Sequence, residues 1–309
     1  DWSSDVCSSD LLDGLGVLER LKAEMPGIAA VVVSAAAQRG AQATLAALEA
    51  GAFDFVDKAS VPRMQMHELA AELVAKVRAA ADSRRRRASP GAAAPTGAFL
   101  PPELLVVGAS TGGPLALMTL LGRLPADLPA AVAVVQHMPS SFVPALAERI
   151  GQSAALRSRA ADARELLEPG TITFLHGGRD MAVARRDGRL AAVPRNPAPG
   201  TPHVPSIDAL FHSAAEICGA RAWGVLLTGM GSDGAEGLLS IRRAGGLTVA
   251  QDESTCAVYG MPRAAVELGA AFAELPLHEI GRYLSEALGG KSNAAAAGTR
   301  EGPVRSSNA

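Results

Sequence analysis

The sequence predicts an α/β protein with a doubly wound, mostly parallel sheet that carries one β-hairpin, preceded by a smaller α/β unit. Apolar runs of strand length alternate with helical patterns along most of the 309 residues. Hydrophobic residues make up 48% of the chain and aromatic residues only 4%, so the core has to be built from Ala, Val, Leu and Ile. A segment rich in Arg, Ala, Pro and Gly over residues 82–102 reads as a linker between two domains.

The N-terminal elements follow the expected alternation of helix and strand. Helical spacing, buried-strand patterns and a closing glycine at Gly51 predict, in order, a helix over 15–25, a strand over 29–35, a helix over 41–52, a short strand from 54 to 58 and a helix over 66–81. The boundaries that follow are a domain over 13–81, a linker over 82–102 and a second domain over 103–288. Residues 1–12 are interpreted as a non-native or disordered leader, and 289–309 as a disordered tail.

The second domain repeats the alternation. The predicted strands cover 104–107, 132–136, 171–175, 181–184, 189–193, 223–227 and 247–250, and the predicted helices lie near 114–122, 142–150, 206–218, 234–244 and 262–268. Asp187 and Gly188 stand between two short apolar runs, which is typical of a β-hairpin.

Composition excludes several classes of protein. A net charge of −2 gives no basic field for nucleic acid. The three cysteines lie far apart without a CxxC motif, so neither a disulfide framework nor a metal site is expected, and a reducing cytoplasm is the default. Because no uncharged apolar run reaches about 18 residues, no membrane insertion is expected. Nothing in the sequence calls for a cofactor.

The stretch LLVVGASTGGP, residues 104–114, is a buried strand followed by a glycine-rich turn. A phosphate-binding loop would need a lysine, which this turn lacks. A nucleotide-dependent oxidoreductase of the short-chain type would need a tyrosine followed four residues later by lysine, but Arg263 and Ala287 follow Tyr259 and Tyr283 at that spacing. The remaining interpretation is a turn that presents Ser110 as a nucleophile.

A serine nucleophile needs a base and a group that orients the base. His137 follows the buried strand AVAVVQ, and Asp233 lies in the glycine-rich turn after the strand GVLLT. The carboxyl ends of parallel strands meet at one edge of a sheet, so Ser110, His137 and Asp233 are expected to lie together there. Taken singly, each has an ordinary structural explanation as a helix cap or a loop residue. The other histidines lack this position and are interpreted as surface or helix residues: His67, His176, His203, His212 and His278.

Together the motifs GASTGGP, QHMP and LTGMGSDGAEG resemble the chemotaxis protein-glutamate methylesterases of the CheB family. The segments PSIDALFHSAA and TVAQDESTCAVYGMPRAA extend the resemblance over about residues 103–288. It implies a serine hydrolase that demethylates glutamate methyl esters, releasing methanol, and deamidates glutamines on methyl-accepting chemotaxis receptors. Ser110 then matches the nucleophile, His137 the base and Asp233 its orienting group.

Backbone N–H groups in the two glycine-rich turns are the candidates for the oxyanion and substrate site, namely those near Thr111, Gly112 and Met230. The sequence departs from the family pattern at LHGGRDM, where His176 and Asp180 occupy changed positions. The resemblance therefore does not define the details of the substrate loop. A non-catalytic signalling module on the same fold is the other alternative, and the complete triad argues against it.

The first domain resembles the second half of a response-regulator receiver, which has a flavodoxin-like fold. Ser34 matches the hydroxyl that contacts the phosphoryl group, and Lys58 matches the lysine paired with the phosphorylated aspartate. No phospho-accepting Asp is assigned, because Val6 stands seven residues before Asp13. We therefore expect no productive phosphorylation through a histidine kinase, and a partial receiver that inhibits the esterase poorly.

Overall fold

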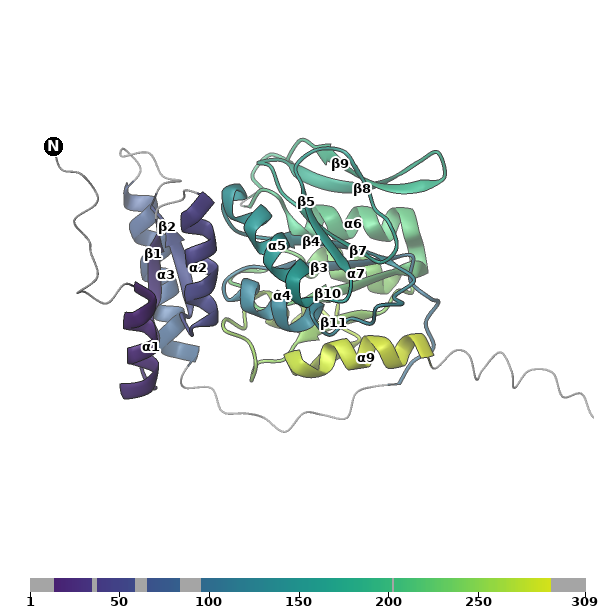
Figure 1. Ribbon diagram of the computed structural model, residues 1–309. Coiled ribbons are helices and arrows are strands. Elements are labelled where there is room, and N and C mark those ends of the chain that lie inside the picture. Colours follow the sequence, from purple (N-terminus) through teal and green to yellow (C-terminus); the bar gives the residue numbers. More distant parts are fainter. Residues whose placement is uncertain (1–13, 35–37, 59–65, 84–95, 202, 290–309) are drawn as a thin grey trace, which may run out of the picture.

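The computed structural model describes residues 14–34, 38–58, 66–83, 96–201 and 203–289. Figure 1 shows two parts: an N-terminal unit, residues 14–83, and a larger C-terminal unit, residues 96–289. The predicted leader, the predicted tail after its first residue Gly289, and most of the predicted linker lie outside the described residues.

The N-terminal unit has the predicted order of elements. These are α1 (Gly14–Glu24), β1 (Val31–Ser34), α2 (Gln38–Glu49), β2 (Asp54–Asp57) and α3 (Met66–Ser83). The two strands pair in parallel, with Val31 opposite Asp54 and Ser34 opposite Asp57. Parallel pairing requires a crossover connection, and α2 supplies it.

A seven-stranded sheet forms the centre of the C-terminal unit, in the order β12-β11-β10-β3-β4-β7-β5, and its neighbouring strands are parallel throughout. Its strands are β3 (Leu104–Ala109), β4 (Ala131–Gln136), β5 (Arg157–Ala161), β7 (Thr171–Leu175), β10 (Ala222–Leu226), β11 (Thr248–Gln251) and β12 (Ala273–Leu275). Every residue of β3, β4 and β10 is buried, as expected for the middle of a sheet covered on both faces.

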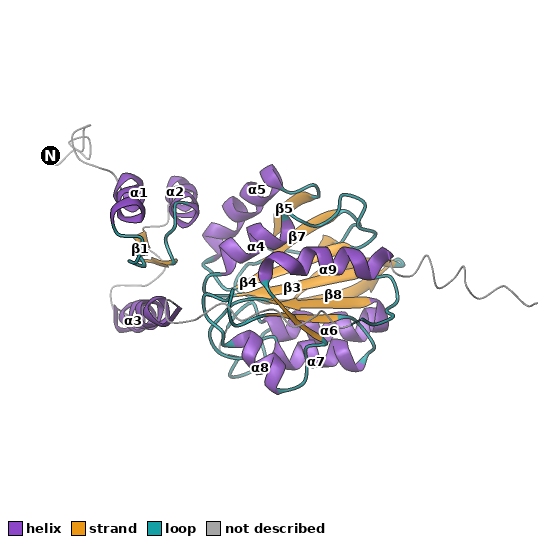
Figure 2. Ribbon diagram, turned by 90° about the horizontal axis from the view of Figure 1, so that it is seen from below, coloured by secondary structure: helices purple, strands orange, loops and turns teal. Residues whose placement is uncertain are grey.

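Helices cover both faces of this sheet, and Figure 2 shows the layers from below. One face carries α4 (Gly113–Leu121), α5 (Val143–Ser153) and α9 (Leu277–Gly289). The other carries α6 (Ile207–Cys218), α7 (Ala235–Arg243) and α8 (Met261–Glu267). Short 3₁₀ turns, η2 (Ser140–Phe142) and η3 (Gly219–Arg221), precede α5 and follow α6. The doubly wound architecture predicted from the alternating patterns is confirmed.

The predicted β-hairpin is present, but it does not extend the main sheet. It comprises β8 (Asp180–Arg186) and β9 (Arg189–Arg195), which pair with β6 (Glu165–Leu166) in a separate three-stranded antiparallel sheet. Both turn residues have positive φ, 49° at Asp187 and 77° at Gly188, as a two-residue hairpin turn requires.

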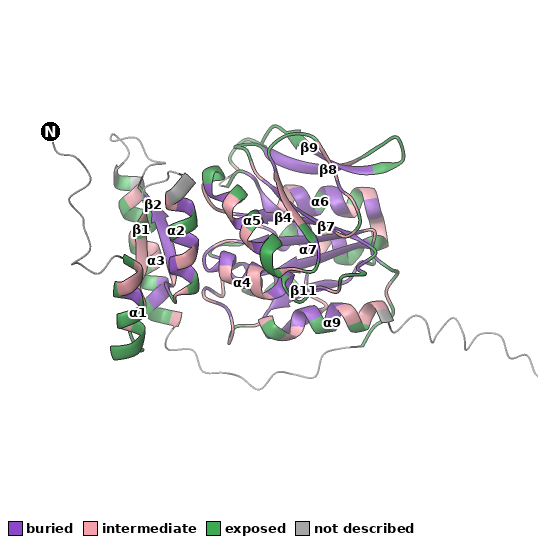
Figure 3. Ribbon diagram, viewed as in Figure 1, coloured by how far each residue is buried: buried purple, intermediate pink, exposed green. Residues whose placement is uncertain are grey.

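The N-terminal unit lies against the α4 and α5 side of the C-terminal unit. The rings of Phe55 and Phe142 have centroids 4.7 Å apart, and the guanidinium of Arg149 pairs with Glu49 of α2. Buried positions of α2 and β2 face this contact, and Figure 3 shows them in purple. The apolar core of one unit is thus continuous with a helix layer of the other.

Candidate active site

The three chemical groups singled out in the sequence follow three adjacent strands. Ser110 comes directly after β3, His137 directly after β4, and Asp233 lies in the turn between β10 and α7. In the sheet β3 stands between β4 and β10, so the three chain segments leave it side by side at its carboxyl edge. The connection order reverses between β3 and β10, and such a switch point is where doubly wound sheets place their sites.

His137 and Asp233 are joined directly. Nε2 of the imidazole lies 2.9 Å from Oδ2 of the carboxylate, and both side chains are about nine-tenths buried, with 10% and 9% exposed. Nδ1 of His137 is buried and has no hydrogen-bond partner among the described residues. With Nε2 held by the carboxylate, Nδ1 is the nitrogen left to accept a proton.

The N-terminus of α6 holds the Asp233 carboxylate from the other side. Oδ1 accepts hydrogen bonds from Ser206 Oγ at 2.9 Å and from the Asp208 N–H at 3.0 Å, and Oδ2 accepts one from the Ile207 N–H at 2.8 Å. A helix N-terminus offers unpaired N–H groups and a positive dipole end, which favour an anion. Burial alone would raise the pKa of Asp233, but the bonds from His137, Asp208 and Ile207 outweigh it and hold that pKa well below its usual range. Asp233 is therefore ionised in the folded protein at neutral pH.

The turn that carries Ser110 is fixed by its backbone. The Ser110 N–H donates to the Thr228 carbonyl, and the Ser110 carbonyl accepts a hydrogen bond from Nε2 of the buried Gln136. The same Nε2 also donates to the His137 carbonyl. Gly113 makes this contact possible, since a Cβ there would stand 1.9 Å from Gln136 Oε1. One amide side chain thus ties the serine turn to the histidine turn. Within the described residues no hydrogen bond joins Ser110 Oγ to His137, a looseness that unliganded catalytic sites often show.

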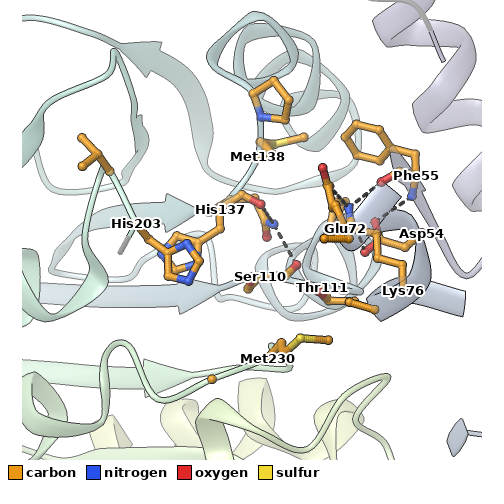
Figure 4. Close-up of a pocket in the computed structure, with 17 residues that line it drawn as sticks. Asp54, Phe55, Glu72, Lys76, Ser110, Thr111, His137, Met138, His203 and Met230 are labelled. Atoms are coloured by element: carbon orange, nitrogen blue, oxygen red, sulfur yellow. Dashed lines mark hydrogen bonds and ion pairs between the residues drawn. The ribbon is translucent and has the colours of Figure 1, made fainter. Parts of the chain in front are cut away.

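A cavity of about 540 Å³ opens over these groups and is shown in Figure 4. Ser110, Thr111, His137 and Met230 line it, so four of the predicted site residues come together there. Among the described contacts, the backbone N–H groups of Thr111 and Met230 have no acceptor. Gly112, expected in the same set, lies instead at the N-cap of α4 with φ 73° and lines a different pocket.

The far wall of the cavity comes from the N-terminal unit, as Figure 4 shows. It includes Asp54 and Phe55 of β2 and Glu72 and Lys76 of α3. Burial raises the pKa of Asp54. Two groups act in the opposite direction and lower that pKa: Lys76, whose Nζ lies 3.5 Å from Oδ2, and the Gly112 N–H. The cavity is thus a cleft between the two units with Ser110 inside it.

Sequence reasoning missed three residues around the triad. Ser206 both caps α6 and binds Asp233; the serine before IDALF is a recognisable N-cap signal. Asp180, noted only as a departure, is buried and accepts a hydrogen bond from the Ser206 N–H at 2.8 Å. His203, interpreted as a surface residue, stacks on His137 with ring centroids 4.4 Å apart. His203 is exposed, but its ring covers the imidazole of His137, and no local pattern marks that contact.

The residues matched to a receiver site lie at one edge of the β1–β2 pair. Ser34 Oγ accepts a hydrogen bond from Thr44 Oγ1 at 2.8 Å, and the Lys58 N–H donates to the Ser34 carbonyl. The Lys58 side chain is exposed.

The described residues show neither a metal cluster nor a membrane span. They contain no cluster of three His, Cys, Asp or Glu side chains suited to a metal ion. None of their helices combines the length and the apolar character needed to span a membrane.

Comparison with known proteins decides the family. A family model described as CheB methylesterase matches residues 105–284, which include Ser110, His137 and Asp233. The chain belongs to the CheB methylesterase family. The match to this family covers the whole seven-stranded sheet except the first residue of β3.

Relatives extend the CheB methylesterase likeness over most of the chain. A protein of Symbiobacterium thermophilum, named protein-glutamate methylesterase/protein-glutamine glutaminase, is 42% identical and aligns over 92% of this chain and 84% of its own length. A Bordetella parapertussis protein of the same name is 42% identical over 91% of this chain and 82% of its own. The crystal structure of the Thermotoga maritima CheB methylesterase catalytic domain matches with a TM-score of 0.58 and 33% identity, covering 60% of this chain and 99% of that one.

Proposed function

We propose that this member of the CheB methylesterase family hydrolyses methyl esters of glutamate side chains and amides of glutamine side chains on chemoreceptors. Ser110 is the nucleophile, His137 the general base and Asp233 the group that orients it. The observation that carries the proposal is the buried pair of His137 Nε2 and Asp233 Oδ2 at 2.9 Å, beside a serine on the adjacent strand end.

The reaction follows from these positions. Ser110 Oγ attacks the carbonyl carbon of the side-chain ester while its proton passes to Nδ1 of His137. The imidazolium that forms is stabilised by the ionised Asp233 and then protonates the departing methoxide, giving methanol. Water, deprotonated by the same imidazole, attacks the acyl-enzyme and releases the glutamate carboxylate. With a glutamine substrate the leaving group is ammonia.

The negative charge on the tetrahedral oxygen needs donors that no other group occupies. The N–H groups of Thr111 and Met230 meet that condition and flank Ser110 in the cavity. Gly112 belongs to this proposal only as the residue that ends the serine turn. Its N–H acts on Asp54 and lowers the pKa of that carboxyl.

The remaining assignments are inferred with this activity. Methylated chemoreceptors are the substrate, and the site of action is the cytoplasm. Residues 103–288 form the catalytic domain and residues 13–81 a partial receiver domain. Ser34 and Lys58 are the receiver residues retained, and no cofactor or nucleic acid takes part.

Methanol release from a methylated chemoreceptor tests the proposal. Ser110→Ala is expected to lower the rate by about 10⁴-fold or more, since a triad without its nucleophile retains only binding and oxyanion contributions. Ser285→Ala, the same change on α9, is the matched control and should keep the wild-type rate, because among the described residues this hydroxyl donates to the Gly281 carbonyl alone.

The same assay separates the alternatives. A nucleotide-dependent oxidoreductase would release no methanol and would bind a nicotinamide nucleotide. A non-catalytic signalling module would be as inactive as Ser110→Ala. Undiminished methanol release by Ser110→Ala would end the nucleophile assignment.

A further inference from the structure

The imidazole of His137 has one hydrogen-bond partner among the described residues. Its Nε2 bonds to Asp233, and its Nδ1 has no partner among the described residues. A ring held at one edge can still tilt about that bond. The only ring stacked on it in the described structure is that of His203, with centroids 4.4 Å apart and planes inclined by 27°.

We propose that His203 is a positioning residue that holds the ring of His137 at the angle needed to take the proton of Ser110. The inference rests on the proposed function, because it concerns how the base of that reaction is aligned. Figure 4 shows the two rings overlapping at the wall of the cavity, which His203 also lines. His203 therefore supports the base from the wall of the cavity.

The position of His203 in the chain is consistent with a positioning role. His203 precedes Ser206 by three residues, and Ser206 binds Asp233 through its Oγ. One short segment thus supplies a contact to the carboxylate and a contact to the imidazole it orients. Asp180 anchors the same segment from β8 by accepting the Ser206 N–H. The segment that holds Asp233 also closes over His137.

A neutral ring suits this position. Partial burial of the ring lowers the pKa of His203, and the neighbouring His137 lowers it further, while Asp233 acts in the opposite direction. When His137 becomes an imidazolium in the reaction, a neutral aromatic face beside it is compatible with that charge, whereas a second cation would oppose it.

Other charged groups around the pair have to be considered in any pH experiment. Asp233 touches His137 directly, and Asp208 of α6 lies behind that carboxylate. Across the cavity the N-terminal unit contributes the charged side chains of Asp54, Glu72 and Lys76. None of these changes when residue 203 is substituted, so a difference between variants at 203 reports on the stacked ring itself.

Three variants of the full chain test the proposal by methanol release from a methylated chemoreceptor. His203→Ala removes the stack and should lower kcat about tenfold with little change in KM, because misalignment of the base affects the transition state rather than binding. His203→Phe keeps a flat ring and should restore kcat to within about threefold of wild type. A role for His203 as a proton carrier predicts the opposite, with Phe as inactive as Ala.

His203→Arg supplies a readout that a merely structural role would not move. A guanidinium can stack on a ring but stays charged, and a fixed cation beside His137 disfavours the imidazolium. The acid limb of kcat/KM should therefore move to lower pH by about half a unit to one unit. Titration of the ¹⁵N-labelled His137 ring by NMR should show the same displacement without requiring activity.

The outcomes are distinguishable. Wild-type kcat in His203→Ala together with an unmoved His137 titration in His203→Arg would overturn the stacking proposal. A folded wild-type chain that releases no methanol would instead overturn the proposed function, and the NMR titration would still test whether residue 203 lies on His137. Thermal unfolding of each variant identifies any loss of folding.

Discussion

At the scale of single residues, the feature that makes the site chemically competent is the number of donors on one carboxylate. Asp233 accepts hydrogen bonds from an imidazole, a hydroxyl and two backbone N–H groups. A carboxylate satisfied in this way stays ionised although it is buried, and it fixes which nitrogen of His137 carries the proton. The base is thereby set to receive a proton on its other nitrogen.

Asp233→Asn tests this account through catalysis. The neutral amide cannot stabilise the imidazolium as an ionised carboxylate does, and it favours the wrong tautomer of the imidazole. The value of kcat should therefore fall by about 10³- to 10⁴-fold. Methanol release under saturating substrate measures it. A fall of less than about tenfold would mean that Asp233 is a structural cap of α6 and does not orient the base.

The same carboxylate gives a pH dependence of stability. Because the pKa of Asp233 is lower in the folded chain than in the unfolded chain, its contribution is complete above the unfolded value of about 3.9 and is lost as the pH falls through the folded pKa. The free energy of unfolding of wild type minus that of Asp233→Asn should stay constant from about pH 7 to 5 and shrink below about pH 4. Denaturant unfolding at several pH values measures the difference, and a difference that grows on acidification would contradict the assignment.

The sequence predicted the site residues that directly follow strands but not those in the irregular segment before α6. Ser110, His137 and Asp233 could be grouped because each comes after an apolar run, and parallel strands bring such positions to one edge. His203 and Ser206 come from the irregular segment before α6, whose path over the sheet has no local sequence signal. Their roles depend on tertiary contacts with His137 and Asp233.

At the scale of elements, α6 links folding to chemistry through its first turn. Ser206 caps the helix by accepting the Ala209 N–H at 3.2 Å and also donates to Asp233. Asp208 in the same turn accepts the Gly237 N–H of α7 at 2.7 Å, and burial raises its pKa. The beginning of α6 is therefore joined both to α7 and to the triad.

Ser206→Ala should lower the free energy of unfolding by about 1–2 kcal/mol, since both a cap and a bond to a carboxylate are lost. Activity should fall by about tenfold or less, because two backbone donors to Asp233 remain. Chemical denaturation and methanol release measure the two effects on one preparation. Ser153→Ala, whose hydroxyl bonds only Ile150 at the end of α5, is the control and should alter neither strongly.

The buried central strands were predicted from sequence, whereas some short or polar strands and one helix were not. The central strands β3, β4 and β10 were found because they are apolar throughout. The edge strand β5 has the sequence RSRAA and β12 has only three residues, so neither shows a buried-strand pattern. The amphipathic helix α9 over Leu277–Gly289 was also missed, although the predicted domain extended to residue 288.

At the scale of the whole molecule, the N-terminal unit forms one wall of the cleft that contains Ser110. Asp54, Phe55 and Lys76 line that wall, and the Phe55–Phe142 and Arg149–Glu49 contacts hold the N-terminal unit against η2 and α5. A receptor helix is far larger than a cavity of about 540 Å³. Because this wall restricts access to Ser110, we now predict stronger inhibition by the N-terminal unit than the sequence alone suggested, and the truncation below tests the two expectations against each other.

Removal of residues 1–90 should raise the rate of methanol release from a methylated chemoreceptor severalfold, because the far wall of the cleft is gone. A small glutamate methyl ester, which fits the cleft, should be hydrolysed at a similar rate by both chains and serves as the control. Equal rates on the receptor would restore the original expectation of weak inhibition.

The placement of the triad on β10, β3 and β4, the third to fifth strands of a seven-stranded sheet, has a consequence for how the enzyme loses activity on heating. Fraying begins at sheet edges, here β12 and β5, and leaves central strands paired until the whole domain opens. Backbone amides of β3, β4 and β10 should therefore exchange with deuterium only through global opening, as hydrogen-exchange mass spectrometry can measure. Thermal inactivation and global unfolding should then coincide, and a chain that has frayed at both edges should still keep Ser110, His137 and Asp233 in register.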